Sequence, residues 1–230
     1  MKNKHIVLGL LASASLVGCG GSSDSGSSKS GSFVGDGIYL NSSDFAVMIV
    51  DSTRTENPLA VGDFANDSVY FVDSATTTGN TMVTKGITVS DSTVTVSLSE
   101  QEMTATFTDS QVTLTAVIDD ANLIYSMDKT AASLPLAQIV GTHTNPDDGS
   151  TWTINADGSF TVNGICTISG TLQRNGDYFN VNATATACAS SSFNGAYTGA
   201  FLTVKYNGTD YIAGLLGNET SLMWGHAPKS

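Results

Sequence analysis

Basic residues are scarce in this chain, which has 9 Lys and Arg against 21 Asp and Glu and a net charge of −12. Such an acidic protein repels phosphate backbones and anionic lipid headgroups. We therefore expect no nucleic-acid partner and no electrostatic docking onto a membrane. Histidine is scarcer still, with 3 residues, so general-base chemistry has few candidates.

Long apolar runs are also absent. The run at residues 6–16 is well below the roughly 20 residues that a membrane-spanning helix needs. It follows Lys2 and Lys4, and a charged start before a short apolar core is typical of a secretory signal peptide, which we place at residues 1–18. Its removal leaves 7 basic against 21 acidic residues, a net charge of −14.

Cysteine occurs three times, and the first, Cys19, ends the apolar run. The four residues 16–19, Leu-Val-Gly-Cys, resemble the lipobox of bacterial lipoproteins. The resemblance implies that Cys19 is acylated and that the protein is held at a membrane by its N-terminal lipid, since each buried CH₂ contributes about 0.8 kcal/mol. In those families an Asp after the cysteine favours the inner membrane; Gly20 stands here, which implies the outer membrane, on either face. The alternative is an ordinary signal peptide with an incidental cysteine.

The residues after Cys19 have almost nothing to bury. Residues 20–32 contain four Gly and seven Ser, so they cannot offset the entropy of ordering and are expected to be disordered. A Gly/Ser coil of this length averages about 20 Å end to end. We interpret residues 19–32 as a lipidated cysteine and a flexible linker.

The other two cysteines, Cys166 and Cys188, follow a secretory signal and are predicted to form a disulfide. Closing this loop contributes about 3 kcal/mol in the chain-entropy model. A metal pair or a catalytic thiol would need histidine or a further thiol nearby. Only His143 and His226 remain after processing.

From residue 33 onward the chain consists of short alternating runs rich in Thr, Val, Ile and Tyr, which indicate β-strands. In "GITVSDSTVTVSLS" the pair Asp91-Ser92 is predicted to turn the chain, and Val94, Val96 and Leu98 are predicted to face inward. Asp-Ser pairs recur every eighteen residues, which suits meandering strands with tight turns; they begin at Asp73, Asp91 and Asp109.

The pattern predicts an all-β fold of two small antiparallel β domains, each a barrel or a sandwich. Alternation stops at residues 128–133, and Pro135 interrupts any strand and is expected to begin a short helical turn. We therefore predict an N-terminal β domain at residues 33–133 and a disulfide-containing C-terminal β domain at residues 134–230.

The C-terminal domain has three strong hairpin signals, Asp157-Gly158, Asn175-Gly176 and Asn207-Gly208. They predict seven strands, near residues 150–155, 159–163, 166–172, 178–185, 199–206, 209–216 and 221–224.

Three stretches of this domain, "IVGTHTNPDDGSTWTINADGSFTVNGICTISGTL", "TATACASSSFNGAYTGAFLTV" and "LMWGHAPKS", resemble the C-terminal half of uncharacterised two-domain β-rich outer-membrane lipoproteins of Gram-negative bacteria. The shared features are a Gly-x-aromatic opening, a glycine-turn hairpin, two distant cysteines and a closing aromatic-Gly. The first half fits that family more loosely, through "GDGIYL" and "DSVYFVD". His143 stands where the family has an aromatic residue. The resemblance implies location and fold, and no activity.

Catalytic and metal-binding patterns are not evident in the sequence. No Gly-x-Ser-x-Gly elbow accompanies the two histidines, so we predict no catalytic residues, and we predict no cofactor. The adjacent acids Asp119-Asp120 and Asp147-Asp148 are interpreted as turns rather than as a glycosidase pair. Asn145, Asp147, Asp148 and Asp157 could supply oxygen ligands for calcium, which is the alternative to the turn interpretation. Their spacing matches no EF-hand loop, so we predict no metal site.

Aromatic residues are concentrated in the second domain, and most are expected to fill its core. Tyr178 and Phe179 are neighbours on one strand and must face opposite sides of it. The alternative interpretation is that some aromatics line a binding surface, for which Tyr178, Tyr197 and Tyr206 are the candidates.

These features predict a membrane-anchored, non-enzymatic outer-membrane lipoprotein that acts as a binding module for an envelope or extracellular protein. The alternative is an inhibitor of a basic cell-wall hydrolase of the lysozyme type, which an acidic surface would attract. The stretch "NGAYTGAF" at residues 194–201 could then form an inserting loop, although it fits a turn and strand equally well.

Overall fold

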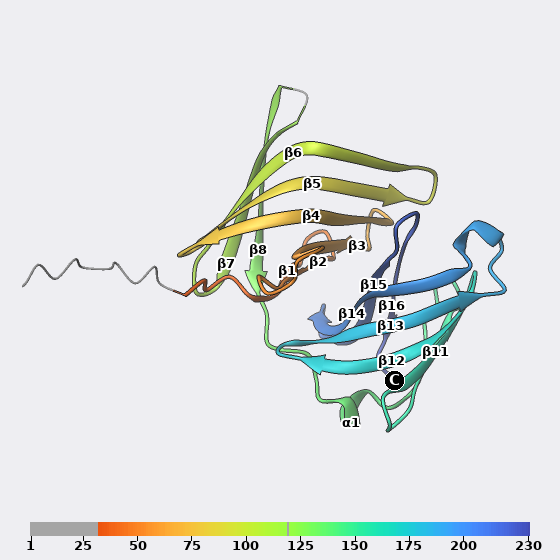
Figure 1. The fold of residues 1–230 in the computed structure, drawn as a ribbon. Helices are drawn as coiled ribbons and strands as arrows, with labels where there is room; N and C mark the ends of the chain where they lie inside the picture. The colour runs from red at the N-terminus through yellow and green to blue at the C-terminus, as the bar shows by residue number, and fades with distance from the viewer. Residues whose placement is uncertain (1–31, 119) are drawn as a thin grey trace, which may run out of the picture.

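The computed structural model describes residues 32–118 and 120–230. It contains two antiparallel sheets, one from each half of the chain (Figure 1). The predicted all-β class with two small β domains is confirmed. The predicted signal peptide, Cys19 and the predicted linker up to residue 31 lie outside the described residues.

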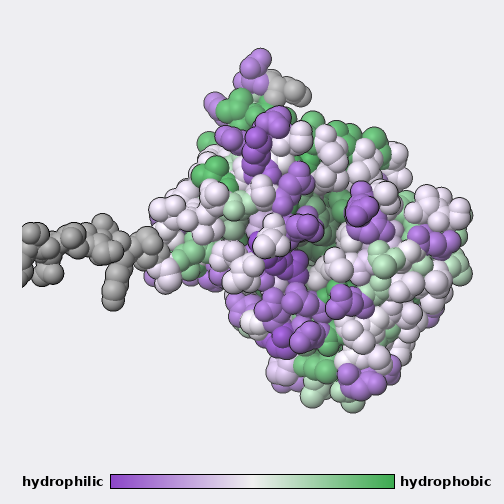
Figure 2. Space-filling view, in the orientation of Figure 1, coloured by the Kyte–Doolittle hydropathy of each residue, from purple (hydrophilic) through white to green (hydrophobic). Residues whose placement is uncertain are grey.

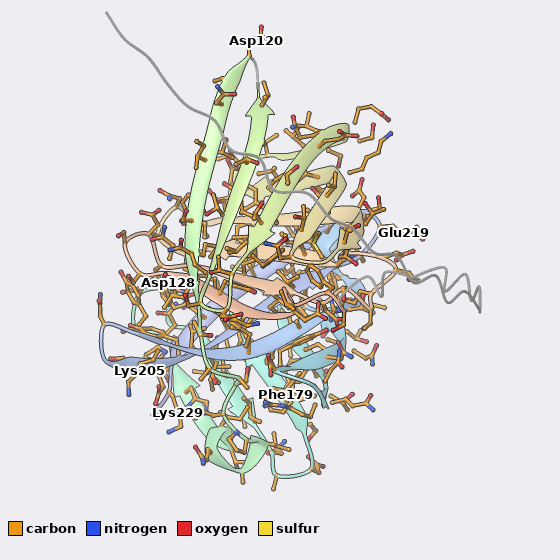
Figure 3. All side chains as sticks on the ribbon, turned by 90° about the vertical axis from the view of Figure 1, so that its left-hand side faces the viewer. Asp120, Asp128, Phe179, Lys205, Glu219 and Lys229 are labelled. Carbon is orange, nitrogen blue, oxygen red and sulfur yellow. A yellow bond between two sulfur atoms is a disulfide. The ribbon has the colours of Figure 1, made fainter. Side chains whose placement is uncertain are left out.

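The first sheet is a closed barrel whose eight strands follow one another in chain order. The strands are β1 (Gly37–Asn41), β2 (Ala46–Val50), β3 (Leu59–Asp63), β4 (Ser68–Thr78), β5 (Thr81–Asp91), β6 (Thr95–Phe107), β7 (Gln111–Ile118) and β8 (Ala121–Lys129). Strands β1 and β8 close the barrel through only two paired positions, Tyr39 with Lys129 and Leu40 with Asp128. The β7–β8 hairpin projects beyond the rest of the barrel, with Asp120 at its tip (Figures 1 and 3).

Two of the three predicted Asp-Ser turns are confirmed. Asp91 ends β5, and its Oδ1 accepts the backbone N–H of Val94 at 2.8 Å, while Asp109 lies between β6 and β7. The turn predicted at Asp73 is wrong, because this residue lies inside β4 opposite an irregularity of β5. Gly86 at that irregularity has φ +76°, and a Cβ there would collide with the Asp73 carboxylate. The position bends the sheet instead of reversing the chain.

The interior of the first barrel is filled by twelve buried side chains, and the two aromatic residues Tyr39 and Phe107 are the largest. Val96 and Leu98 face inward as predicted, since Leu98 pairs with Ile87 and Ile87 with the core residue Val72, but Val94, Val96 and Leu98 are 52%, 43% and 42% exposed. Burial requires a covering element, and β7 pairs with β6 only from Met103 to Phe107.

The second sheet also has eight strands in chain order, one more than predicted. They are β9 (Gly141–Thr144), β10 (Thr151–Ile154), β11 (Ser159–Asn163), β12 (Thr167–Asn175), β13 (Tyr178–Thr186), β14 (Gly195–Tyr206), β15 (Thr209–Gly217) and β16 (Leu222–Pro228). The short β9 was not predicted. The three predicted Gly hairpin turns are confirmed, and Gly158, Gly176 and Gly208 all have positive φ.

A segment of residues 130–140 connects the sheets and contains the short helix α1 (Leu136–Ile139), which follows Pro135 as predicted. The segment is fixed to β14 because Thr203 donates its N–H to Ser133 Oγ at 3.0 Å and accepts the N–H of Leu134 at 2.8 Å.

The outer faces of the two sheets pack against each other through a third apolar cluster. The first barrel contributes side chains from β1 to β4, among them Leu40, Ile49 and Phe71, and the second sheet contributes side chains from β13 to β16, among them Leu202 and Leu215. Gly62 permits this approach, because a Cβ there would lie 2.6 Å from Leu215 Cδ2.

Candidate functional site

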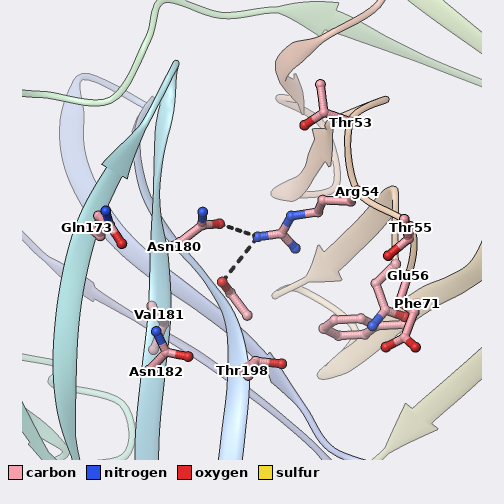
Figure 4. Close-up of a pocket in the computed structure, with 12 residues that line it drawn as sticks. Thr53, Arg54, Thr55, Glu56, Phe71, Gln173, Asn180, Val181, Asn182 and Thr198 are labelled. Atoms are coloured by element: carbon pink, nitrogen blue, oxygen red, sulfur yellow. Dashed lines mark hydrogen bonds between the residues drawn. The ribbon is translucent and has the colours of Figure 1, made fainter.

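The clearest polar connection between the two sheets begins at Arg54, in the turn between β2 and β3. Its Nε donates to the Tyr178 hydroxyl at 2.9 Å, and its Nη2 donates to Asn180 Oδ1 at 2.7 Å and to the Gly199 carbonyl at 3.2 Å. Figure 4 shows this side chain reaching from the first domain to β13 and β14. One guanidinium therefore holds three positions of the second sheet.

Asp51 lies beside Arg54 and is bound from the same side. Tyr178 donates its hydroxyl to Asp51 Oδ2 at 2.6 Å, and Asn175 Nδ2 donates to the same oxygen at 3.0 Å. Burial raises the pKa of Asp51, but hydrogen bonds from Thr53 and Tyr178 outweigh it, so this pKa lies below its usual 3.8. Burial and the bond to Asp51 raise the pKa of Tyr178 to about 12. The carboxylate stays ionised and the phenol neutral across the neutral pH range.

A polar groove adjoins this network between the two domains. It consists of two cavities of about 390 and 470 Å³ that share Glu56, Asn57, Phe71 and Thr198. Figure 2 shows the surface hollowed between the domains, with hydrophilic residues along the rim. Most of the lining is amide and hydroxyl, contributed by Thr53, Thr55, Thr88, Thr95, Ser97, Gln173, Asn180, Asn182, Asn218, Thr220 and Ser221. The groove offers neutral hydrogen-bonding groups together with four charged side chains, Arg54, Glu56, Asp73 and Glu219.

An aromatic cluster forms a second contact between the domains. Phe45 stacks on Tyr206 with ring centroids 4.1 Å apart, and His226 lies 5.1 Å from Phe45 and 4.8 Å from Phe64. Burial lowers the pKa of His226, although the charges of two nearby carboxylates partly offset this effect. The histidine is held in its neutral form as a packing ring.

The exposed apolar side chains are concentrated on the first barrel. Eight of the eleven large hydrophobic residues exposed in the described chain lie between β5 and β8: Val83, Val94, Val96, Leu98, Val117, Ile118, Leu123 and Ile124. Hydrophobic residues accordingly line the upper edge of this barrel in Figure 2 and recur on the projecting hairpin.

Four of these side chains continue the interior face of the barrel beyond its closed part. Leu98 pairs with Ile87, which pairs with the core residue Val72, and paired residues of antiparallel strands share a face. Val96 occupies the next position on that face. On β7 and β8, Ile118 and Leu123 follow the buried Leu114 on the same face. We call Val96, Leu98, Ile118 and Leu123 the interior strip.

The three tyrosines predicted as binding candidates pack against other parts of the protein instead. Tyr178 is 3% exposed and faces the first domain, and Tyr197 is 2% exposed and donates its hydroxyl to Phe193 O at 3.0 Å. Tyr206 packs on Phe45. Phe179 faces the core of the second sheet, opposite to Tyr178 as its neighbouring position requires.

The two histidines lie apart from the groove lining. His143 is buried; its Nδ1 accepts the N–H of Ser230 at 3.1 Å, so its Nε2 carries the proton donated to the Ile139 carbonyl at 2.9 Å. It joins β9 to the end of the chain beside β16. Residues 194–201 are not an inserting loop, since Gly195–Phe201 belong to β14 and both Tyr197 and Phe201 are buried.

The acidic pairs and the calcium candidates occupy turns, as far as the structure describes them; Asp119 lies outside the described residues. Asn145 Oδ1 accepts the N–H of Asp147, Asp148 Oδ1 accepts that of Ser150, and Asp157 Oδ1 that of Ser159. Each of these oxygens accepts a hydrogen bond from a backbone N–H of its own turn. Within residues 32–118 and 120–230, no three His, Cys, Asp or Glu side chains are grouped to hold a metal ion.

The predicted disulfide between Cys166 and Cys188 is present in the structure. It follows from strand pairing, because Thr167 and Thr186 are the terminal partners of the β12–β13 hairpin and each cysteine lies just beyond one of them. The bridge therefore closes the open end of this hairpin. Cys166 is buried in the core of the second sheet.

Comparison with protein-family models, curated proteins and solved structures found no match to this chain. In the described part of the chain, no helix has the length and apolar character needed to cross a membrane. Sequence reasoning missed Asp51 and Arg54, whose only signal was an arginine within the turn-rich stretch "DSTRTENP".

Proposed function

We propose that this protein is a lipid-anchored, non-enzymatic binding module of the bacterial outer membrane, and that it holds a protein partner through β5 to β8 of its first barrel. The observation that carries the proposal is the concentration of eight exposed apolar side chains between β5 and β8, four of which form the interior strip. Exposed apolar patches on soluble domains mark interaction surfaces. Full burial of one Val, Leu or Ile contributes about 1.5–3 kcal/mol, and covering these partly exposed side chains contributes a fraction of that each, so several must be covered together to offset the cost of association.

The rest of the molecule supports a scaffold that presents this surface. The Asp51–Arg54–Tyr178 network and the aromatic cluster around Phe45 fix the two domains against each other. The apolar strands lie on the part of the first barrel that extends beyond these contacts (Figure 1). A rigid base with one unpartnered surface is suited to binding.

The attachment is supported by the sequence around Cys19, which carries the lipobox resemblance, and by the Gly/Ser composition that follows it. Several acyl chains make such an anchor permanent, and the linker would separate the barrels from the bilayer by about 20 Å. The resemblance of the second domain to two-domain outer-membrane lipoproteins supports the same location.

The positions of the two histidines support a binding role over a catalytic one, because His143 bonds to backbone groups and His226 packs among aromatic rings. The alternative role, inhibition of a basic cell-wall hydrolase, keeps the support of the acidic charge. The inserting loop considered for that role is not present, because Gly195–Phe201 belong to β14.

The binding role is tested by site-specific photo-crosslinking in intact cells. A photoreactive residue replaces Val96 or Leu123, both on the interior strip, in the full chain, and the matched controls are Thr171 and Thr184, which are exposed positions of the second sheet. We expect one adduct of defined mass from the two apolar positions and none from the controls. Adducts of equal yield at all four positions, or at none, would contradict the proposal.

A further inference from the structure

The observation that leads further is an unpaired strand edge on β6. This strand runs from Thr95 to Phe107 and is paired with β5 along most of its length, but its ladder with β7 begins only at Met103. Where the ladder stops, Gln101 Nε2 donates to the Val117 carbonyl at 3.1 Å and replaces the next backbone bond. The other edge of residues 95–101 faces no strand in the described structure.

This edge lacks proline and lysine, two of the features that protect natural edge strands, although the pairing of β6 with β5 is irregular at residues 99–101. Proline, lysine and inward-pointing charges usually block pairing with another chain. Residues 95–101 contain neither proline nor lysine, and their one charge, Glu100, is paired with Lys85 at 2.8 Å. Residues 95–100 are all exposed.

The two faces of the edge differ in chemistry. Val96 and Leu98 lie on the interior strip, on the face of the barrel core. Thr95 and Ser97 lie on the opposite face, where Ser97 shares a 2.9 Å hydrogen bond with Thr88 and both line the larger cavity of the groove. A strand added here meets apolar side chains on one face and hydroxyl groups on the other.

We infer that the free edge of β6 binds an extended segment of the partner protein by strand addition, with alternating apolar residues of that segment packed on the interior strip. Main-chain hydrogen bonds supply affinity in this mode and alternate side chains supply selectivity. The inference rests on the proposed function and specifies how the partner is held.

Charge distinguishes a foreign segment from a second copy of this chain. Glu100 lies on the edge and Glu102 just beyond it, and Lys85 is the one base beside them, 2.8 Å from Glu100, which leaves this group with a net charge of −1. Edge-to-edge pairing of two copies would bring these acids together in chains that each carry −12. A segment with Lys or Arg beside its apolar residues is complementary.

The test uses an eight-residue synthetic peptide of alternating valine and threonine with a lysine at each end. Its control is the same peptide with N-methyl groups on alternate residues, which removes backbone donors and keeps the side chains. Amide hydrogen exchange is measured on the full chain. We expect the plain peptide to slow exchange in residues 95–101 by about tenfold or more, and the methylated peptide to have no effect.

A protein variant tests the same edge from the other side. Residues 99–101 have no partner on β5, so Ser99→Pro blocks the free edge without removing a bond to β5. We expect this variant to keep the wild-type melting temperature and to lose the peptide effect; if it unfolds, the methylated peptide decides the question.

Three results would overturn strand addition. They are no protection at millimolar peptide, equal binding of the methylated peptide, and a dimer in sedimentation whose amides at 95–101 are already protected, which would assign the edge to a second copy. A specific adduct from Val96 combined with any of these results would leave the proposed function standing and remove only this binding mode.

Discussion

Replacing Tyr178 by Phe removes one oxygen atom from the junction of the two domains, and with it three hydrogen bonds. The hydroxyl donates to Asp51 at 2.6 Å and accepts from Arg54 and from Asn175, each at 2.9 Å. Two of the three partners are charged. The side chain is 3% exposed, so water does not easily take the place of the lost oxygen.

The expected cost follows from the partners. A hydrogen bond to a charged group contributes about 1.5–3 kcal/mol and a neutral one about 1 kcal/mol. Asp51 keeps its bonds from Thr53 and Asn175, and Arg54 keeps Asn180 and Gly199, which reduces the loss. We therefore expect Tyr178→Phe to lower the free energy of unfolding by about 2–3 kcal/mol.

Tyr197→Phe is the matched control, because this tyrosine is equally buried and its hydroxyl makes one neutral bond, to the Phe193 carbonyl. It should cost about 1 kcal/mol. Urea unfolding is followed by the fluorescence of Trp152 and Trp224; the Trp224 indole donates to Asp67 of the first domain at 3.1 Å and reports on the junction, whereas Trp152 reports on the core of the second sheet. If Tyr178→Phe costs no more than the control, the network does not join the domains as argued.

The same network predicts that the free energy of unfolding decreases at acid pH. The pKa of Asp51 lies below 3.8 in the folded protein, so the unfolded chain takes up a proton first as the pH falls. Its stabilisation is complete above about pH 4 and is lost as the pH falls through the folded pKa. Tyr178→Phe removes one of the bonds that lower this pKa. The free energy of unfolding of this variant should therefore depend less steeply on pH in the acid range.

Three further outcomes are expected. Replacing Cys166 and Cys188 by Ser should cost about 3 kcal/mol, because the unfolded chain gains the entropy of an open loop; an unchanged melting temperature would refute this. Because burial lowers the pKa of His226, stability should be complete above about pH 6.5 and fall as the pH drops through the lower folded value. His226→Phe should abolish that slope, and a slope that persists would assign it to other groups. Gly199→Ala should lower the free energy of unfolding by about 1–3 kcal/mol, because its Cβ would collide with the Leu215 carbonyl. Gly164→Ala is the control: its Cβ meets only Ser150 Cβ at 3.3 Å, so it should cost less than about 1 kcal/mol in the same urea assay. Equal costs would contradict the steric argument.

Turn chemistry is local, and for that reason most turns could be predicted from the sequence. A Gly after Asp or Asn readily adopts the positive φ that a tight hairpin turn needs, whatever the rest of the fold. The turns at Gly158, Gly176 and Gly208 could therefore be predicted from two residues each. Asp73 begins the same Asp-Ser pair as the turn at Asp91. It lies within β4 because pairing across β5, with Gly86 opposite, outweighs its local preference.

Exposure could not be predicted in the same way. Alternation correctly places Val96 and Leu98 on the barrel's interior face, but whether that face is covered depends on how far β7 runs beside β6. The contacts between the domains could not be predicted either, since Arg54 and Asn180 are 126 positions apart and no local pattern relates them. The short β9, "GTHT", has too few residues to show a period.

If a partner covers the apolar strands of the first barrel in the cell, it shields position 96. The direct test is the rate at which a cysteine introduced by Val96→Cys reacts with a membrane-permeant maleimide, divided by the rate for Thr171→Cys on the second sheet. We expect this ratio to be several-fold lower in intact cells than in the purified protein. An identical ratio in both settings would contradict the proposal.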